Sequence, residues 1–92
     1  MKIAAFAVVL LLLGAVAGMA ADMEMQSVKS SLIDKIGYDA DAKTLAVQMH
    51  NSLDVYLYEE VPASVFEQFQ KADSKGRFFV EHIKGQYKSK LD

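Results

Sequence analysis

The segment Ser74-Lys75-Gly76-Arg77 has the residue types of a small anion-binding turn. It precedes a stretch with helical spacing, and a helix N-terminus offers free backbone N–H groups and a partial positive charge. Gly76 allows close approach of a ligand, and Lys75 and Arg77 add two cations, so the turn could hold a phosphate or a carboxylate. The alternative is a tight turn between two helices, in which Ser74 caps the second helix and Asp73 repels an anion. We favour this second interpretation.

Other side chains that could support catalysis or metal binding lack the spacing that such chemistry needs. His50 and His82 are the only histidines, and no H-x-x-x-H pattern accompanies them. Because the chain has no cysteine, thiolate zinc sites, disulfides and cysteine nucleophiles are excluded. Four aspartates could suggest a calcium site, but they do not follow the ordered D-x-D-x-D-G pattern of a calcium loop. They are Asp34, Asp39, Asp41 and Asp54. The sequence therefore predicts no enzyme activity, no metal site and no cofactor.

Charge is divided unevenly along the chain. Residues 21–70 carry three lysines against nine acidic residues, whereas residues 71–92 carry six basic residues against three acidic ones. A basic helical face could contact nucleic acid or anionic lipid, although such faces are more often simply solvated, and Glu81 lies among the cations. The basic side chains in question are Lys75, Arg77, Lys84 and Lys88. Binding of nucleic acid or another anion is therefore kept as an alternative function.

The first 20 residues have the pattern of a secretory signal peptide. Met1-Lys2 supplies a positive charge, an uncharged apolar run follows, and small residues favour cleavage after Ala20 or Ala21. An uncleaved membrane anchor is the alternative, because residues 3–21 give 19 uncharged positions, enough to span a bilayer. We expect a secreted or periplasmic protein that contacts a membrane only if this segment is retained. The expected organisation is a signal peptide at 1–20, a flexible lead-in at 21–27 and one domain at 28–92.

Apolar spacing and turn residues predict three strands followed by two helices. Pro62 suits the start of the first helix, and Gly85 is expected to weaken the second by about 1 kcal/mol relative to alanine. The expected elements are strands at 35–38, 44–50 and 55–60, joined by turns at 39–43 and 51–52, and helices at 63–72 and 77–91. The predicted fold class is α+β, a small three-stranded antiparallel meander followed by two helices packed on one face.

A hairpin tip at residues 51–52 fixes the register of the second and third strands. Val47 then faces Tyr56. Leu45 faces Tyr58, so that both tyrosines lie on the face covered by the helices. The opposite face receives apolar residues that nothing else in the domain is left to cover, namely Ile33, Ala46, Val55 and Leu57. This strip is a candidate interface for a protein partner or for a second copy of the chain.

The alternative for the strip is that polar neighbours shield it. Gln48 and Lys35 lie beside it in the expected register, and the polar lead-in precedes it. We weigh the open strip and the shielded strip equally. The strip is nevertheless the best route from this sequence to a function.

Six short motifs in a fixed order resemble the KTSC domain, which is named for a segment like the C-terminal part of some lysyl-tRNA synthetases. The resemblance covers about residues 28–88. The motifs are Val28-x-Ser30-Ser31-x-Ile33, Ile36-Gly37-Tyr38-Asp39, Leu45-x-Val47, Tyr56-x-Tyr58-x-x-Val61-Pro62, Ala72-x-Ser74-Lys75-Gly76-x-Phe78-Phe79 and Ile83-x-x-x-Tyr87. No single motif is specific, but six in this order and spacing are.

The resemblance implies a fold and a non-catalytic accessory role rather than a reaction, and it defines no molecular activity. The chain departs from the family pattern in its hairpin tip, which lacks the usual glycine. Met49 stands where an aromatic residue is common, and Val80 stands where asparagine often follows the aromatic pair. Together with the export signal, the resemblance leads us to expect an exported binding module that contacts a protein partner or itself.

Overall fold

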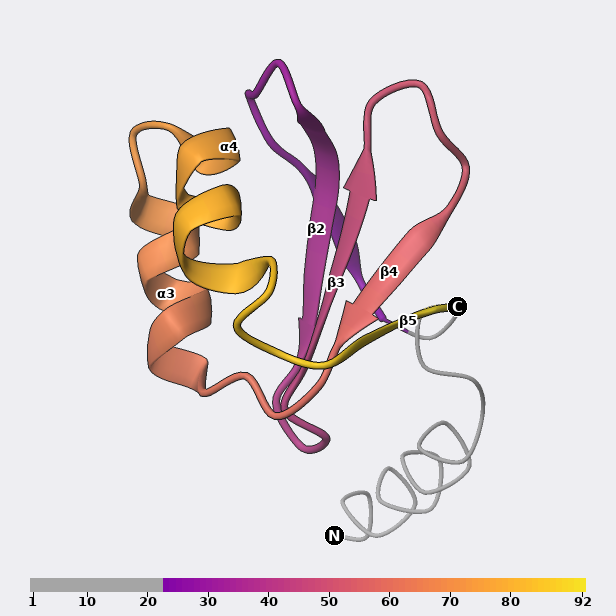
Figure 1. The fold of residues 1–92 in the computed structure, drawn as a ribbon, viewed down its shortest axis with the longest axis vertical. Helices are drawn as coiled ribbons and strands as arrows, with labels where there is room; N and C mark the ends of the chain where they lie inside the picture. The colour runs from indigo at the N-terminus through magenta and orange to yellow at the C-terminus, as the bar shows by residue number, and fades with distance from the viewer. Residues whose placement is uncertain (1–22) are drawn as a thin grey trace, which may run out of the picture.

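The computed structural model describes residues 23–92, so the expected signal peptide at 1–20 lies outside the described residues. Five strands form one antiparallel sheet in the order β1-β2-β3-β4-β5, with the helices beside it (Figure 1). The strands are β1 (Met25–Ser27), β2 (Ile33–Asp39), β3 (Thr44–Met49), β4 (Val55–Tyr58) and β5 (Ser89–Leu91). The helical elements are α3 (Ala63–Lys71), α4 (Lys75–Phe78) and the π-type turn η1 (Phe79–Ile83). Within residues 23–92, no helix has the length and apolar character needed to cross a membrane.

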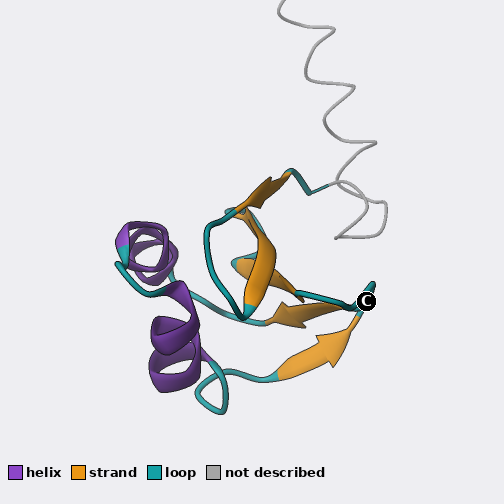
Figure 2. Ribbon diagram, turned by 90° about the horizontal axis from the view of Figure 1, so that it is seen from above, coloured by secondary structure: helices purple, strands orange, loops and turns teal. Residues whose placement is uncertain are grey.

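The helices and the sheet form two layers, and the core lies between them (Figure 2). Aromatic pairs join the layers. Tyr38 on β2 stacks on Phe66 of α3, with ring centroids 4.7 Å apart. Tyr58 on β4 meets Phe79 edge-on at 5.7 Å. The buried core residues are Ile33, Ile36, Leu45, Val47, Tyr58, Val61, Phe69, Phe79 and Ile83.

The β3–β4 hairpin has the register that the sequence predicts. Val47 pairs with Tyr56, and Leu45 pairs with Tyr58. Asn51 adopts a positive φ of 61°, a conformation that asparagine tolerates better than most residues. The helix face of this hairpin is therefore correctly predicted.

The sheet has five strands, so the expectation of three is wrong. β1 forms within the predicted lead-in and pairs with β2, and Met25 lies opposite Gly37. A Cβ atom at Gly37 would come within 2.7 Å of Met25 Sδ and 2.9 Å of the Glu24 carbonyl oxygen. Glycine at this position therefore lets the residues before β2 pack closely on the sheet.

The second helix is shorter than expected and is followed by β5. Lys84, the C-cap residue, is extended (φ −63°, ψ 125°), and Gly85 follows with a φ of +82°, so the chain turns out of the helical path after Ile83. Lys84 N–H donates to the Phe79 carbonyl at 2.8 Å and closes the π-type turn. The turn at Lys84 and Gly85 thus ends the helix, and the continuous helix predicted for 77–91 is wrong. Tyr87 and Leu91 lie beyond it.

Candidate functional site

The Ser74–Arg77 turn uses its polar side chains within the fold. Ser74 Oγ accepts a hydrogen bond from the Arg77 N–H at 3.2 Å and so caps α4. Lys75 Nζ donates to the Ala72 carbonyl at 2.9 Å. Arg77 Nε lies 3.9 Å from Glu81 Oε2, and both side chains are exposed. These contacts agree with the interpretation as an inter-helix turn.

Gly76 brings α4 against the loop that precedes β2. A Cβ atom at Gly76 would lie 3.3 Å from Leu32 Cβ and 3.7 Å from Ser30 Oγ. Ser30 Oγ in turn accepts hydrogen bonds from the N–H groups of Leu32 and Ile33, both at 3.1 Å. Two sequence motifs that are 44 positions apart, from Ser30 to Ser74, therefore meet in space.

His50 ties the β3–β4 loop to the same region. Its Nε2 lies 2.7 Å from the Ser30 carbonyl oxygen, and its backbone N–H donates to the Leu32 carbonyl at 3.0 Å. Its Nδ1 lies 3.9 Å from Asp34 Oδ1, with both side chains 41% exposed. No sequence motif predicts this contact. The geometry gives His50 a structural role, and within residues 23–92 no group of three His, Cys, Asp or Glu side chains is placed to hold a metal.

The fold raises the pKa values of two tyrosine hydroxyls, those of Tyr38 and Tyr58. Burial, followed by the nearby charge of Asp39, raises the pKa of Tyr38 above its ordinary value of 10.0. Its hydroxyl donates to the Val61 carbonyl at 2.5 Å. Burial, followed by the proximity of Tyr56, likewise raises the pKa of Tyr58. Both hydroxyls are therefore neutral at physiological pH, and the Tyr38 hydroxyl serves the fold through its bond to Val61.

The apolar strip expected on the face away from the helices is largely buried. Ile33 is fully buried and faces the helices, because the β2–β3 register shifts between Ile33 and Lys35 and turns its side chain inward. Ala46 is 0% exposed and Leu57 is 2% exposed. Val55 is only half-buried. The expectation of an open strip is therefore wrong for Ile33, Ala46 and Leu57.

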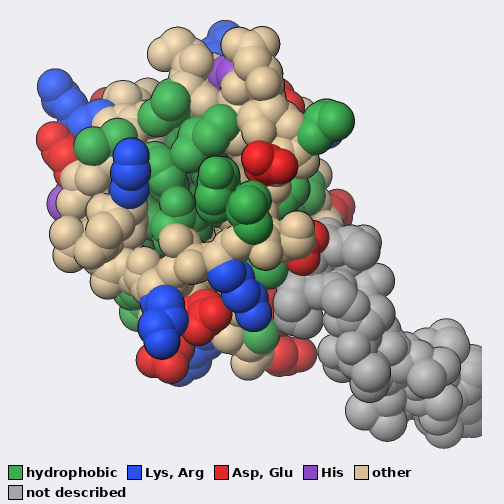
Figure 3. Space-filling model, turned by 45° about the vertical axis from the view of Figure 1, so that its right-hand side comes forward, with side chains coloured by type: hydrophobic (Ala, Val, Ile, Leu, Met, Phe, Trp, Pro, Cys, Tyr) green, Lys and Arg blue, Asp and Glu red, His purple; other side chains and the backbone are tan. Residues whose placement is uncertain are grey.

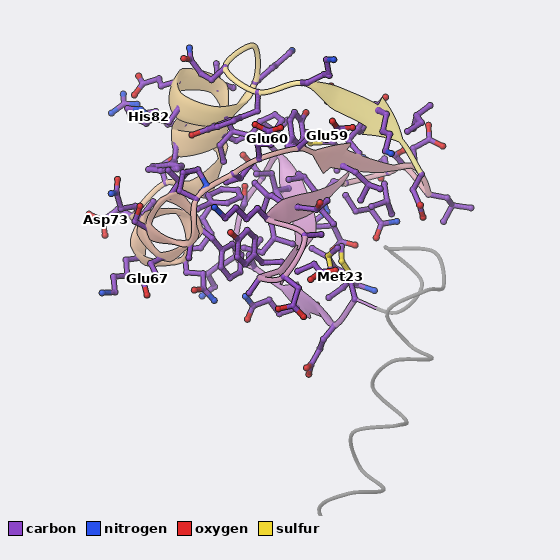
Figure 4. All side chains as sticks on the ribbon, turned by 90° about the horizontal axis from the view of Figure 1, so that it is seen from below. Met23, Glu59, Glu60, Glu67, Asp73 and His82 are labelled. Carbon is purple, nitrogen blue, oxygen red and sulfur yellow. The ribbon has the colours of Figure 1, made fainter. Side chains whose placement is uncertain are left out.

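Residues of the lead-in cover part of that face. The sulfur atoms of Met25 and Met23 would lie 2.7 Å and 3.3 Å from a Cβ at Gly37. Gly37 pairs with Ala46, and Met23 lies on the side of the sheet away from the helices (Figure 4). The interpretation that the lead-in shields the strip is therefore the better one.

A groove that the sequence did not predict lies between the two layers, at the β1 edge. It has a volume of about 310 Å³. Its lining residues are Gln26, Ser27, Val28, Lys29, Ile36, Gln70 and Lys75. Residues from β1, β2, α3 and α4 meet here. The groove could not be predicted from the sequence because it depends on β1, a strand of three residues that is too short to show a period.

A second cavity of about 340 Å³ lies toward the opposite edge of the sheet. It is lined by Ala42, Thr44, Leu57, Glu59, Glu60 and Lys90. Lys90 Nζ lies 3.8 Å from Glu59 Oε2, so its ammonium group is already paired with a carboxylate. The two cavities therefore differ in charge: in the part of the chain that the structure describes, two lysines and no acidic residue line the first, and two glutamates with one lysine line the second.

Comparisons with known proteins give one consistent result. The family model described as the KTSC domain matches residues 29–87. The crystal structure of a KTSC domain protein from Yersinia pestis superposes with a TM-score of 0.72 at 40% identity, over 76% of this chain and 97% of that one. A protein from Tsukamurella paurometabola is 38% identical over 65 residues, which cover 71% of this chain and 96% of that protein. A lysine–tRNA ligase from Nostoc punctiforme is 38% identical over 60 residues, which cover 65% of this chain and 10% of the ligase.

Proposed function

The chain belongs to the KTSC domain family, and on this premise we propose that it is an exported, non-catalytic module that binds another protein. The proposed location is secreted or periplasmic, and its support is the signal-peptide pattern of the first 20 residues. The proposed lack of catalysis rests on the way the described domain uses its reactive side chains. Ser74 caps a helix, and His50 holds a loop.

The observation that carries the proposal is the form of the sheet. It begins with β1 and ends with β5, each of three residues, and neither has a further strand beside it within residues 23–92. An edge strand presents backbone N–H and C=O groups that can pair with an added strand. Strand addition is a common way for small domains to bind proteins.

Exposed apolar side chains add to this support. Leu91 on β5 is 55% exposed and pairs with Tyr56, and Leu53 in the β3–β4 loop is 93% exposed. Figure 3 shows hydrophobic side chains gathered at the centre of one side of the molecule, with charged side chains around them. Apolar surface with a charged rim is a feature of protein interaction sites.

The test is cross-linking in expressing cells with a tagged full-length chain, followed by capture from the exported fraction under denaturing conditions. We expect the chain in that fraction, joined to a discrete second protein or to another copy of itself. Leu11→Arg, which interrupts the apolar run of the expected signal, serves as the control that blocks export. A chain retained in the cytoplasm would contradict export, and the absence of any protein adduct would contradict the binding role.

A nucleic-acid-binding role is the second candidate, and the matches to lysine–tRNA ligases favour it. The basic residues do not form the helical face that the sequence predicts, because η1 ends at Ile83, before Lys84 and Lys88. Nuclease treatment of the captured material separates the two candidates. Loss of the adduct with nuclease supports nucleic acid, and its persistence supports a protein partner.

A further inference from the structure

The outer side of β1 has backbone groups that are free to pair. The Val28 N–H donates to the Asp34 carbonyl at 3.0 Å, and Gln26 lies opposite Ile36. Because hydrogen-bonded pairs alternate in an antiparallel ladder, the N–H and C=O of Ser27 point away from β2. No strand among residues 23–92 occupies that outer side. A strand added at this side could form hydrogen bonds with the outward N–H and C=O of Ser27.

The groove beside this edge has the chemistry of a peptide site. Val28 is half-buried and packs against the core, and Ile36 is fully buried, so the two give the groove an apolar floor. The amide side chains of Gln26 and Gln70 are exposed and can bind a peptide backbone. A bound strand would place alternate side chains toward this floor.

The charge of the groove selects an acidic ligand. Lys29 and Lys75 line it, and no acidic side chain among the described residues does. One N–H of Lys75 Nζ is used by the Ala72 carbonyl, which leaves two further donors on the ammonium group. Glu67 and Asp73 project from α3 and the turn after it, away from the sheet (Figure 4).

We propose that an extended, acidic segment of a partner protein adds to the outer edge of β1 and places a carboxylate between Lys29 and Lys75. This proposal rests on the proposed function and names its ligand class and its site. β5 is the less suitable edge, because the cavity near it is lined by Glu59 and Glu60. A nucleic acid is the less suitable ligand, because no aromatic side chain of residues 23–92 lines the β1 groove for base stacking.

The probe is a fluorescein-labelled decapeptide of alternating valine and glutamate, with binding measured by fluorescence anisotropy. The protein is the chain purified from the exported fraction, or the full-length chain in detergent if the leader is retained. Ser27→Pro removes an outward N–H that β2 does not use, and Lys29→Glu reverses one charge of the groove. We expect each to weaken binding about tenfold, which corresponds to the loss of one good hydrogen bond or ion pair.

The chain offers matched controls for both variants. The Lys88 carbonyl accepts from Glu59 and the Asp92 N–H donates to Val55, so the N–H of Ser89 points outward from β5 as that of Ser27 does from β1. Ser89→Pro and Lys84→Glu should therefore bind the peptide within about twofold of the unaltered chain. Circular dichroism checks that all variants remain folded. If Ser27→Pro unfolds, a peptide with N-methyl groups on alternate backbone nitrogens tests the same pairing and should not bind.

Several results would overturn the proposal. One is equal affinity of Ser27→Pro and Ser89→Pro for the valine–glutamate peptide. Another is equal affinity of the unaltered chain for a valine–lysine peptide and for the valine–glutamate peptide. The third is stronger competition against the labelled peptide by an RNA oligonucleotide than by the unlabelled peptide. The outcome is separate from that of the proposed function. A protein adduct in cells together with an unused β1 groove would leave the binding role standing and reject this site.

Discussion

The start of α4 touches Leu32 at Gly76, where a Cβ atom would come to 3.3 Å from Leu32 Cβ. This contact joins the Ser30-Ser31 loop to the Ser74-Lys75-Gly76 turn. Both lie close to the β1 groove, because Lys29 and Lys75 line it. The packing of Gly76 therefore sets the position of the two lysines on which the proposed site depends.

Gly76→Val should destabilise the domain by about 1–3 kcal/mol, because branched bulk at this contact forces the loop and α4 apart. Urea denaturation measures the change in the free energy of unfolding. Adding Leu32→Gly should recover part of the loss, since it removes both Leu32 Cβ and Leu32 Cδ2, the two atoms that the new side chain would meet first. Equal destabilisation in the single and double variants would show that the contact is not the cause.

Gly37→Ala should loosen β1 from the sheet. The new Cβ would lie 2.9 Å from the Glu24 carbonyl oxygen, a backbone atom that cannot move aside without displacing the chain. We expect a loss of about 1–3 kcal/mol and faster amide hydrogen exchange at residues 25–28 than in the rest of the sheet. Unchanged exchange at β1 would contradict the close packing described for Gly37.

Substitution of Gly85 distinguishes the observed chain path from a continuous helix. At a φ of +82°, Gly85→Ala should destabilise the domain by about 1 kcal/mol, since alanine is strained in the left-handed region. Gly85→Asn should cost less, because asparagine tolerates this region better. Within a continuous helix, Gly85→Ala would instead stabilise by about 1 kcal/mol. The sign of the change in thermal or urea stability decides between the two.

The free energy of unfolding should fall at alkaline pH, because the hydroxyls of Tyr38 and Tyr58 ionise there. Burial raises the pKa of both hydroxyls in the folded state above the ordinary value of 10.0, so the folded chain binds more protons than the unfolded chain at alkaline pH. The stabilisation is fully present below pH 10 and is lost as pH rises through the folded-state pKa values. Tyr38→Phe should cost about 1 kcal/mol at neutral pH through loss of the bond to Val61, and it should reduce the alkaline fall. An alkaline fall of the same size in Tyr38→Phe would count against Tyr38 as a source.

The β3–β4 hairpin could be predicted because several local signals agree. Strict alternation, a tip with asparagine and the Tyr56–Tyr58 pair all place the same face inward. Pro62 also indicated the start of α3, for which it is the N-cap residue. Ser74 was correctly expected to cap the second helix.

The elements that could not be predicted have no local sequence pattern that sets them apart. β1 and β5 are three-residue strands that exist only because longer strands pair with them. The register shift between Ile33 and Lys35 turns Ile33 inward against the alternation of its neighbours. The backbone conformation of Gly85 could not be distinguished in sequence from a glycine tolerated within a helix. The groove could not be predicted either, because β1 forms part of it and has no local sequence pattern.

The most direct test of the binding role is site-specific photo-cross-linking in expressing cells. A photoreactive amino acid replaces Ser27 in one full-length chain; Ser27 is exposed and lines the β1 groove, and its replacement keeps the outward backbone N–H, Lys29 and Lys75. In another chain it replaces Lys84, beyond η1 and outside the groove lining. We predict a discrete protein adduct from position 27 that the acidic valine–glutamate peptide suppresses, and no such adduct from position 84. No adduct from either position, or equal adducts from both that the peptide leaves unchanged, would contradict this prediction.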